Sequence, residues 1–411
     1  MENTKTIVVK FGGSILTSPK DITLAAEKIA KEVEKGTKIV VVVSALAGVT
    51  DNLLKTAYEI SQNNLGKPEL DEVLSMGERT ATRLMTVALR ALGLKVVSLD
   101  PLDNLWPIYT DSNFGNAEVL LDKTESAVLE KIKPLVNEGY IVVVPGFVGL
   151  SPEGKITTLG RGGSDITAMV LGRCLNSDEV IFVKDVSGIL SADPKKVSNP
   201  EKINVLDAEE MYTLSSAGAK VLHPKALKYV KNGVTLRVVG LNEDFSSGTV
   251  IKGELNLGLK VVLNNKPVSM VTIVGKEISP TNIVPKILSE EMPLEKLLGL
   301  TFSYPSVILY VEESPPGFID KLHKLIKSKR AAKAIHSFEP LSQITISGHD
   351  LEKTPGIIDT IVAPLSLNNI NLYGLITVSS SVRLFIHWND REKAYSLIKE
   401  SLTKAGLLKE D

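Results

Sequence analysis

The feature that most constrains the fold is an alternation of short apolar strands with helical patterns in the first half of the chain. Residues 39–44 read IVVVVS, and a run so rich in β-branched residues is typical of a strand covered on both faces. Residues 5–10 read KTIVVK and run into a Gly-Gly turn, which indicates a second buried strand. A helical pattern between them ends at Gly36. Strand, helix and strand in this order predict a parallel sheet covered by helices.

The same alternation continues to about residue 240 and predicts a doubly wound, mainly parallel α/β domain. The further elements that we expect are helical stretches over 69–92, a strand at 95–99, a helix at 121–138, strands at 141–145 and 180–185, two more helices, one opening at Pro224, and a last strand at 234–239. In open sheets of this kind, ligands bind at the carboxyl ends of the strands. We therefore expect the polar or glycine-rich loops at these ends to converge on one face; they are Gly12-Gly13-Ser14, Ser44 to Asp51, Gly146 and Lys184-Asp185.

The second half of the chain has a different rhythm, which begins after a loop-like stretch near Ser246. Two successive segments of about 70 residues predict elements in the order βαββαβ, which is the order of a ferredoxin-like unit. The first segment includes an expected helix at 281–291, and the second starts near residue 342 and ends before its last strand. A strand-like stretch at 258–263 has no place in the first segment, so it is the candidate to complete the second.

Composition excludes several classes of protein. The chain has 411 residues, 43% of them hydrophobic and 23% charged, with a net charge of −1, so nothing favours nucleic acid or an anionic membrane as a partner. A single cysteine, Cys174, excludes a disulfide within the chain and lies in an apolar helical pattern, so we interpret it as a buried hydrophobe. The five histidines lack the spacing of metal ligands. No signal sequence and no apolar run of membrane-spanning length is found, which favours a cytoplasmic location.

The most unusual stretch of the first half is TLGRGGSDITA at residues 158–168. Its glycines allow sharp turns, and either Ser164 or Asp165 can cap the helix that follows. A helix N-terminus favours anions, and the planar guanidinium of Arg161 matches a carboxylate or a phosphate. Taken alone, the stretch fits an anion-binding loop or a plain connector equally well.

Six motifs together carry a resemblance to a known family. They are KFGGS at 10–14, VVSALAGVTDNLL at 42–54, SMGERTATRLM at 75–85, LGRGGSDITA at 159–168, DVSGILSADPK at 185–195 and GAKVLHPKAL at 218–227. Their order and spacing resemble those of aspartate kinases, in the amino-acid kinase superfamily, and the final repeat is similar to ACT regulatory domains. The resemblance implies an amino-acid kinase catalytic domain at 1–255, a first ACT-like unit at 256–340 and a second at 341–411, with the strand at 258–263 as a candidate to complete it.

The activity implied is transfer of the ATP γ-phosphoryl group to the side-chain carboxylate of L-aspartate, giving 4-phospho-L-aspartate. In that family this is the first step toward lysine, threonine and methionine. A carboxylate is already a nucleophile at pH 7, so the enzyme needs no general base; it must overcome the repulsion of two anions and hold them in line. Mg²⁺ is implied because it screens the phosphate charges, and no protein ligand is assigned to it.

The resemblance implies that Lys10 neutralises the phosphoryl group during transfer. The backbone N–H groups of Gly12, Gly13 and Ser14 would donate hydrogen bonds to phosphates. Asp165 would orient Lys10. The plain alternative for Lys10 is a solvated strand end, and its place before Gly-Gly favours a function.

The amino acid would be held by complementary charges. Glu78 matches the residue that holds the ammonium group, and Arg161 matches the residue that pairs with the α-carboxylate. Ser44 and Thr50 match residues near the side-chain carboxylate, and Ser164 and Asp165 would complete the pocket. Without the resemblance, Glu78 is a solvated helix charge and the hydroxyls are turn or helix caps.

The nucleotide would lie near Asp185, Asp193, Lys195 and Lys220. Lys184 departs from the threonine that is usual in this motif, and instead resembles the second phosphate-binding lysine of related kinases.

The regulatory half matches its family less closely. TPGI at 354–357 and NINLYGLITVSSS at 369–381 look like parts of an ACT unit, whereas ISPTNIVPKIL at 278–288 lacks the usual glycine loop. Binding of an amino-acid effector and a purely dimer-forming role both stay open, with lysine, threonine, methionine or none as the effector. Exposed sheet edges on such units lead us to expect a homodimer or higher homo-oligomer.

Two other functions compete with aspartate kinase. A sister kinase could act on glutamate or its N-acetyl form, but GERTA and the ACT pair argue against it. A non-catalytic amino-acid sensor could keep the fold, but intact Lys10, Glu78, Arg161 and Asp165 argue against it.

Overall fold

The computed structural model describes residues 4–62, 64–219, 221–231, 233–255, 258–275, 294–329, 332–348, 351, 354–378 and 380–408. The chain divides into two compact units, Met1–Leu255 and Asn256–Asp411, and each is considered by itself. No helix in the described ranges has the length and apolar character needed to cross a membrane.

The first unit is built on one eight-stranded sheet in the order β10-β12-β11-β7-β1-β2-β4-β3. Its strands are β1 (Thr6–Phe11), β2 (Lys38–Val43), β3 (Val96–Ser98), β4 (Ile141–Pro145), β7 (Glu179–Lys184), β10 (Val205–Asp207), β11 (Thr235–Gly240) and β12 (Thr249–Lys252). Neighbours pair in parallel except β11 and β12, which confirms the mainly parallel sheet. The expectation that the sheet ends with the strand at 234–239 was wrong, because β12 and β10 extend it. Both are too short to give a periodic signal in the sequence.

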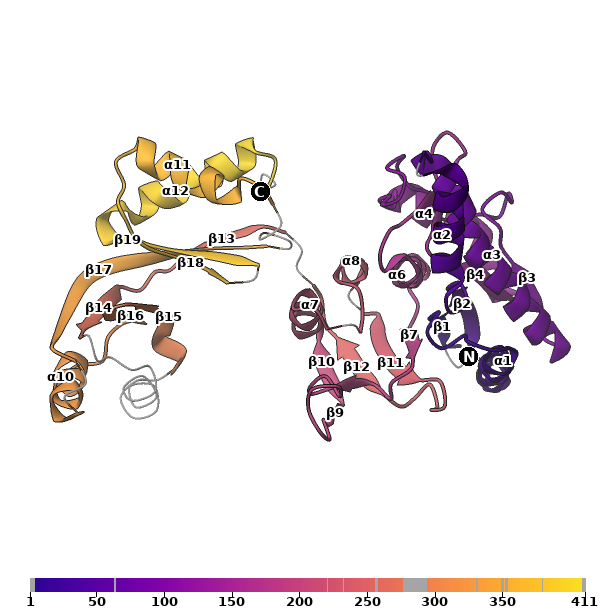
Figure 1. Cartoon of the computed structure of the whole chain (residues 1–411), viewed down its shortest axis with the longest axis horizontal. Coiled ribbons are helices and arrows are strands. Elements are labelled where there is room, and N and C mark those ends of the chain that lie inside the picture. The colour runs from indigo at the N-terminus through magenta and orange to yellow at the C-terminus, as the bar shows by residue number, and fades with distance from the viewer. Residues whose placement is uncertain are drawn as a thin grey trace. The chain divides into compact units, whose positions relative to one another are not determined.

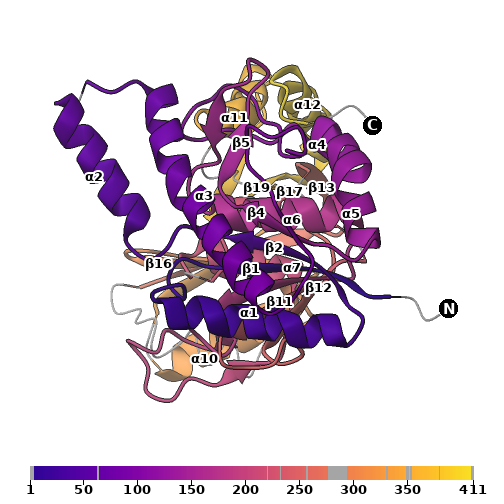
Figure 2. The same cartoon turned by 90° about the vertical axis from the view of Figure 1, so that its right-hand side faces the viewer.

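Helices cover both faces of this sheet. One face carries α1 (Pro19–Glu34) and α3 (Lys67–Ala91). The other carries α4 (Leu121–Ala127), the π-helical turn η1 (Val128–Ile132), α5 (Lys133–Asn137), α6 (Gly163–Leu175), α7 (Ala208–Ser216) and α8 (Pro224–Leu227). Helix α2 (Val49–Ser61) packs against α3 and buries none of its residues, and Figure 2 shows it standing out from the sheet. Two small hairpins complete the unit, β5 (Val148–Leu150) with β6 (Ile156–Thr158) and β8 (Ile189–Leu190) with β9 (Lys202–Ile203).

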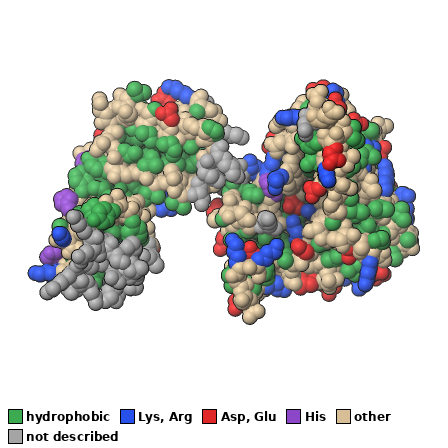
Figure 3. Space-filling view, in the orientation of Figure 1, with side chains coloured by type: hydrophobic (Ala, Val, Ile, Leu, Met, Phe, Trp, Pro, Cys, Tyr) green, Lys and Arg blue, Asp and Glu red, His purple; other side chains and the backbone are tan. Residues whose placement is uncertain are grey.

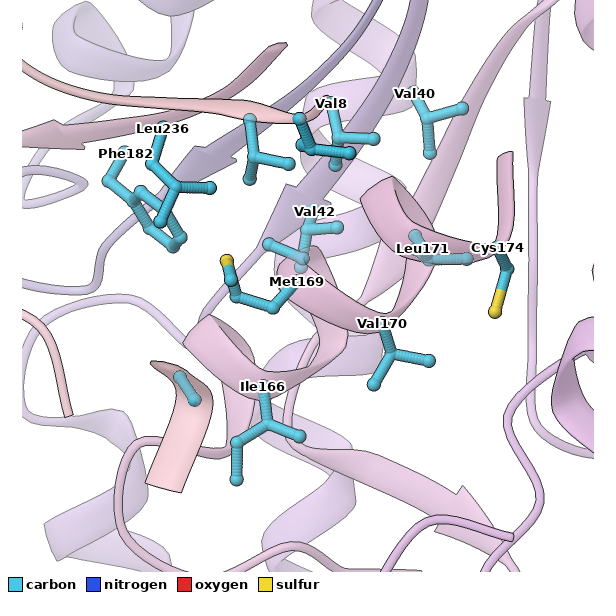
Figure 4. Packing of buried hydrophobic residues seen from close by; sticks show 14 of the residues in the cluster. Val8, Val40, Val42, Ile166, Met169, Val170, Leu171, Cys174, Phe182 and Leu236 are labelled. Carbon is cyan, nitrogen blue, oxygen red and sulfur yellow. The ribbon is translucent and has the colours of Figure 1, made fainter. Parts of the chain in front are cut away.

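Helix α6 is the centre of the larger core. It is buried along almost its whole length, and its Met169 and Leu171 pack with Val8 and Val42 of the sheet (Figure 4). Cys174 lies in the same core, and burial raises the pKa of its thiol to about 12, which confirms it as a buried hydrophobe.

The strand pattern of β1 determines where Lys10 points. Successive side chains of a strand face opposite sides. Val9 packs in the core beneath α1 and α3, whereas Val8 packs in the core of α6. Lys10 therefore leaves the sheet on the α6 side, beside the first turn of that helix.

The order of the strands opens a crevice at this point. Strand β1 lies between β2, which leads to β4 and β3, and β7, which leads to β11. Lys10 is level with Val42 of β2 and Phe182 of β7, so the carboxyl ends of the three strands lie side by side. Loops diverge from a parallel sheet where the strand order reverses, and ligands bind there.

The second unit contains a seven-stranded sheet. Its strands are β13 (Lys260–Leu263), β14 (Val268–Val274), β15 (Leu297–Ser303), β16 (Ser306–Glu312), β17 (Ala334–Ser347), β18 (Leu372–Val378) and β19 (Ser381–His387). Its helices are η3 (Leu294–Lys296), α10 (Phe318–Lys329), α11 (Ile357–Leu367), η5 (Trp388–Asp390) and α12 (Arg391–Lys404). The helix expected at 281–291 lies outside the described residues.

Strand β17 joins the two repeats. Its first half pairs with β14, and its second half pairs with β19 on one side and β13 on the other. The division expected between residues 340 and 341 thus falls inside one strand. The four-residue strand β13 lies beside the second repeat, at the position of its missing last strand.

The two halves of this sheet, one from each repeat, pack face to face, with helices outside. Figure 1 shows α11 and α12 above β18 and β19, and α10 at the opposite side of the unit. Between the two halves, the ring of Tyr310 stacks on that of Phe385 with 3.8 Å between centroids. The register of β15 shifts just before Gly299, and that of β18 shifts just before Gly374. A Cβ on either glycine would collide with a side chain of the other repeat. The paired interruptions support an internal repeat.

Candidate active site

A cavity of about 710 Å³ lies in the first unit at the carboxyl ends of β1 and β2. It is bounded by the loops that follow these strands, by one face of α3 and by the loop that leads into α6. The predicted site residues that line it are Lys10, Gly13, Ser14, Ser44, Thr50, Glu78, Arg161, Ser164 and Asp165. The structure therefore brings residues from four separate sequence motifs to one place.

An ion pair lies at the floor of this cavity. Lys10 and Asp165 are each 6% exposed, and Lys10 Nζ is 2.7 Å from Asp165 Oδ1. Lys184 Nζ, at the end of β7, is 3.7 Å from the other carboxylate oxygen. Burial alone would raise the pKa of Asp165, but Lys10 and Lys184 beside it hold that pKa below its usual range. Two amines, Lys10 at the floor and Lys184 next to it, thus share one carboxylate, an arrangement that suits a phosphate, and burial lowers the pKa of Lys184.

The loop into α6 adds a helix N-terminus to these charges. The N-cap residue is Gly162, with a φ of 75° and no side-chain cap, so neither Ser164 nor Asp165 is the N-cap. Asp165 pairs with Lys10 instead. A Cβ on Gly162 would lie 2.2 Å from Cβ of His223, so only glycine fits. The first N–H groups of α6 carry the positive end of its dipole and favour an anion.

Glu78 is a buried acid on the wall of the cavity. It lies in α3, is 4% exposed, and its Oε2 has no hydrogen-bond partner among the described residues. Burial raises the pKa of Glu78 to about 7, although Lys10 and the backbone at Ala45 oppose the shift. Helix α3 comes close to the loop after β2 at Gly77. A Cβ built on Gly77 would lie only 2.9 Å from Cβ of Ala45. A buried carboxylate whose Oε2 has no partner among the described residues can receive an ammonium group.

The raised pKa of Glu78 predicts a pH dependence of amino-acid binding. Only the ionised carboxylate pairs with an ammonium group, and protonation occurs as the pH falls through about 7. We expect the KM for the amino acid to rise about tenfold between pH 8 and pH 6. Glu78→Gln should give a high KM that no longer changes over this range. Steady-state kinetics at fixed ATP would check this; a wild-type KM without pH dependence would contradict it.

The remaining amino-acid residues are more open. Arg161 is exposed at the rim of the cavity, where its side chain can reach a ligand that enters. Ser44 and Thr50 are half-buried, the first after β2 and the second in the first turn of α2. The loop after β1 approaches the loop after β2 so closely that a Cβ on Gly13 would lie 2.6 Å from the carbonyl oxygen of Ala45.

Several residues expected around the nucleotide do not line the cavity; they are Gly12, Lys184, Asp185, Asp193 and Lys195. Gly12 and Lys184 are nevertheless next to its floor, through Lys10 and Asp165 respectively. Asp185 is exposed just beyond β7. Asp193 accepts a hydrogen bond from the backbone N–H of Lys195 within an exposed loop. Lys220 lies outside the described residues, and the roles of this group stay predictions.

Sequence reasoning missed Asp51, Asp71 and Phe147, which also line the cavity. Asp71 is the most buried of them, at 1% exposed. It precedes Glu78 by two turns of α3, so the two acids share one face of the helix. That spacing was the available signal in the sequence.

Metal-ligating side chains do not cluster in the described residues. No group of three or more His, Cys, Asp or Glu side chains there could hold a metal ion. A cavity of about 440 Å³ in the second unit is lined by Glu313, Asp320 and Glu339, with no lysine or arginine among its described lining residues. Its negative charge does not suit a phosphate.

Comparison with known proteins agrees with this fold. Residues 5–240 match the profile of the amino acid kinase family, which defines the class of the first unit. The aspartokinase of Bacillus sp. (strain MGA3) is 31% identical, over 97% of this chain and 98% of its own length. The chain belongs to the amino acid kinase family and, within it, to the aspartokinases.

Solved structures share the fold. Aspartate kinase from Synechocystis superposes with a TM-score of 0.74 at 24% identity, covering 97% of this chain and 69% of that one. E. coli aspartokinase III in complex with aspartate and ADP gives a TM-score of 0.56 at 22% identity, over 97% of this chain and all of that one. The same enzyme in complex with lysine and aspartate gives 0.55 at 21% identity, over 98% of this chain and all of that one.

Proposed function

We propose that this chain transfers the γ-phosphoryl group of ATP to the side-chain carboxylate of L-aspartate, giving 4-phospho-L-aspartate and ADP. The observation that carries the proposal is a single cavity that joins a buried amine, Lys10, to a buried acid, Glu78, and an arginine, Arg161. A free amino acid presents an ammonium and a carboxylate at fixed spacing, and Glu78 and Arg161 are complementary to them. Lys10 is left for the phosphoryl group.

The chemistry requires charge compensation more than proton transfer. An oxygen of the aspartate side-chain carboxylate attacks the γ-phosphorus, a new P–O bond forms, and the bond from phosphorus to the bridging oxygen of ADP breaks. No proton moves, so no general base is needed. Lys10 and the N-terminus of α6 stabilise the charge on the transferred group, and Asp165 holds Lys10 in place through their 2.7 Å ion pair. Lys184 is a second amine beside the carboxylate of Asp165, with its Nζ 3.7 Å from Oδ2.

Nucleotide and metal are assigned more coarsely. We propose that the ATP phosphates lie toward the end of β7, where Lys184 and Asp185 follow each other. Asp165 is already paired with two lysines, so it is a poor ligand for a divalent cation. Mg²⁺ would therefore be held by phosphate oxygens and water, which is its usual preference, and would screen the phosphate charges.

The test of the function is a trap for the acyl phosphate. We expect incubation with ATP, Mg²⁺ and L-aspartate in the presence of hydroxylamine to give aspartyl hydroxamate, and chelation of Mg²⁺ to abolish it. L-glutamate in place of aspartate should give none. Hydroxamate with glutamate alone would favour the sister kinase, and hydroxamate with neither would favour a non-catalytic sensor; either result contradicts the proposal.

The second unit supports a regulatory and dimer-forming role. We propose catalytic and regulatory domains divided near residue 255, and pairing between copies through the second unit. Phe302 of the edge strand β15 is 49% exposed and Val378 of β18 is 53% exposed, and hydrophobic side chains gather over β17 to β19 in Figure 3. The proposal includes an amino-acid effector of unspecified identity. It also includes a cytoplasmic location.

A further inference from the structure

Asp71 forms a junction between distant parts of the first unit. Its carboxylate, 1% exposed, accepts hydrogen bonds from the backbone N–H groups of Gly115, at 2.9 Å, and Thr158, at 2.8 Å. The hydroxyl of Thr158 donates a third, at 2.7 Å. Burial by itself raises the pKa of this carboxyl, and the three donors oppose that shift by stabilising the anion. One side chain of α3 thus fastens two segments that are far from it in sequence.

Both fastened segments support residues 159–163, which we call the arginine loop. Thr158 immediately precedes this loop, and the backbone N–H of Ala117 donates to the carbonyl of Thr158 at 2.9 Å. A Cβ on Gly160 would lie 2.6 Å from Oδ1 of Asn116, so the loop packs directly on the neighbouring segment. Holding Gly115 and Thr158 therefore fixes the start of the loop that carries Arg161.

Lys225 holds the same region from α8. Its Nζ lies 3.1 Å from Oδ1 of Asn116 and 3.4 Å from the carbonyl oxygens of Ala117 and Leu159. It also pairs with Glu118 at 3.1 Å. The arginine loop is thus tied at its base by a carboxylate of one helix and an amine of another.

We propose that Asp71 is a positioning residue that fixes the arginine loop, and through it the guanidinium of Arg161, for binding of the amino acid. The proposal rests on the proposed function, in which Arg161 pairs with the substrate α-carboxylate. Arg161 is exposed and makes no ion pair within the described residues, so its reach depends on where its backbone is held. A displacement of about 1 Å in an orienting group can cost about 10²-fold in rate. The carboxylate of Asp71 already accepts three hydrogen bonds from Gly115 and Thr158. It is therefore better suited to holding the loop than to pairing with the substrate ammonium.

The test compares Asp71→Asn with Asp71→Ala. The asparagine oxygen can accept from both N–H groups while its amide donates to the Thr158 hydroxyl, so every hydrogen bond survives without the charge. We expect Asp71→Asn to keep the KM for aspartate within about threefold, and Asp71→Ala to raise it about tenfold or more with little change in the KM for ATP. If asparagine is as damaging as alanine, or if neither has an effect, the proposal is overturned.

A double-mutant cycle shows whether Asp71 acts through Arg161. We expect Asp71→Ala to add little to the loss already caused by Arg161→Ala, because coupled residues are not additive. Additive losses would overturn the proposal. Thr158→Val, which removes only one hydrogen bond, provides a milder variant should Asp71→Ala fail to fold, and should raise the KM for aspartate about threefold.

Hydrogen exchange gives a readout that does not need activity. Asp71→Ala should speed amide exchange over residues 111–118 and 158–163, whereas Asp71→Asn should not. Glu179→Ala is the matched control, because Glu179 is also a buried acid, 3% exposed, but pairs with Lys5 and Arg237 at the opposite end of β7. Unchanged exchange in Asp71→Ala would contradict the inference. Absence of aspartate phosphorylation by the wild-type protein would instead contradict the proposed function.

Discussion

Replacing Lys10 by methionine should lower kcat by at least about 10²- to 10³-fold, the range found when a single preorganised donor to a developing charge is removed. Methionine keeps the length and the apolar stem of the side chain but removes the only lysine among the described residues that line the cavity. Because Lys10 is buried beside Asp165, no solvent cation can replace it in the same geometry. The measurement is single-turnover hydroxamate formation at saturating ATP and aspartate.

Lys5→Met is the matched control for this prediction. Lys5 lies just before β1, whereas Lys10 lies near the end of that strand. Like Lys10, Lys5 pairs with a buried carboxylate, that of Glu179, at 2.7 Å. The control should keep wild-type kcat, since it lies at the amino end of the strand and away from the cavity. Equal losses in the two variants would mean that Lys10 matters for folding and not for phosphoryl transfer.

Much of the fold followed from the sequence because the central strands are buried on both faces. Strands β1, β2, β4 and β7 are runs of β-branched residues, and this composition carries a strong signal. Strands β10 and β12 consist of three and four residues, and their pairing depends on neighbours that only the folded chain brings together. The continuity of β17 across both repeats is likewise a result of tertiary pairing, since each half bonds to a different repeat.

The site was predicted where its residues belong to motifs, and was missed where they do not. Glu78 and Arg161 were identified because they belong to two motifs, at 75–85 and 159–168, that resemble those of aspartate kinases. Asp71 lies outside these motifs, and its spacing from Glu78 is a weak signal because an aspartate in an amphipathic helix usually faces solvent. Its donors lie 44 and 87 residues along the chain, and only the folded backbone brings them to one carboxylate.

Removing Arg161 should act on one substrate only. We expect Arg161→Ala to lower kcat/KM for aspartate by about 10²-fold or more, because the variant loses the group that orients the α-carboxylate, while the KM for ATP stays within about threefold. The side chain is exposed and has no buried partner among the described residues, so stability should change by less than about 0.5 kcal/mol.

Two further variants separate charge from geometry at this position. Arg161→Lys keeps the charge but loses the planar pair of donors, so its loss for aspartate should fall between those of wild type and Arg161→Ala. Arg173→Ala removes an arginine from the last turn of α6, the helix that follows the arginine loop, and should leave both KM values unchanged. If the defect of Arg161→Ala appeared instead in the KM for ATP, this arginine would belong to the nucleotide. The amino acid would then need another partner for its α-carboxylate, and the rim of the cavity would have to be reassigned.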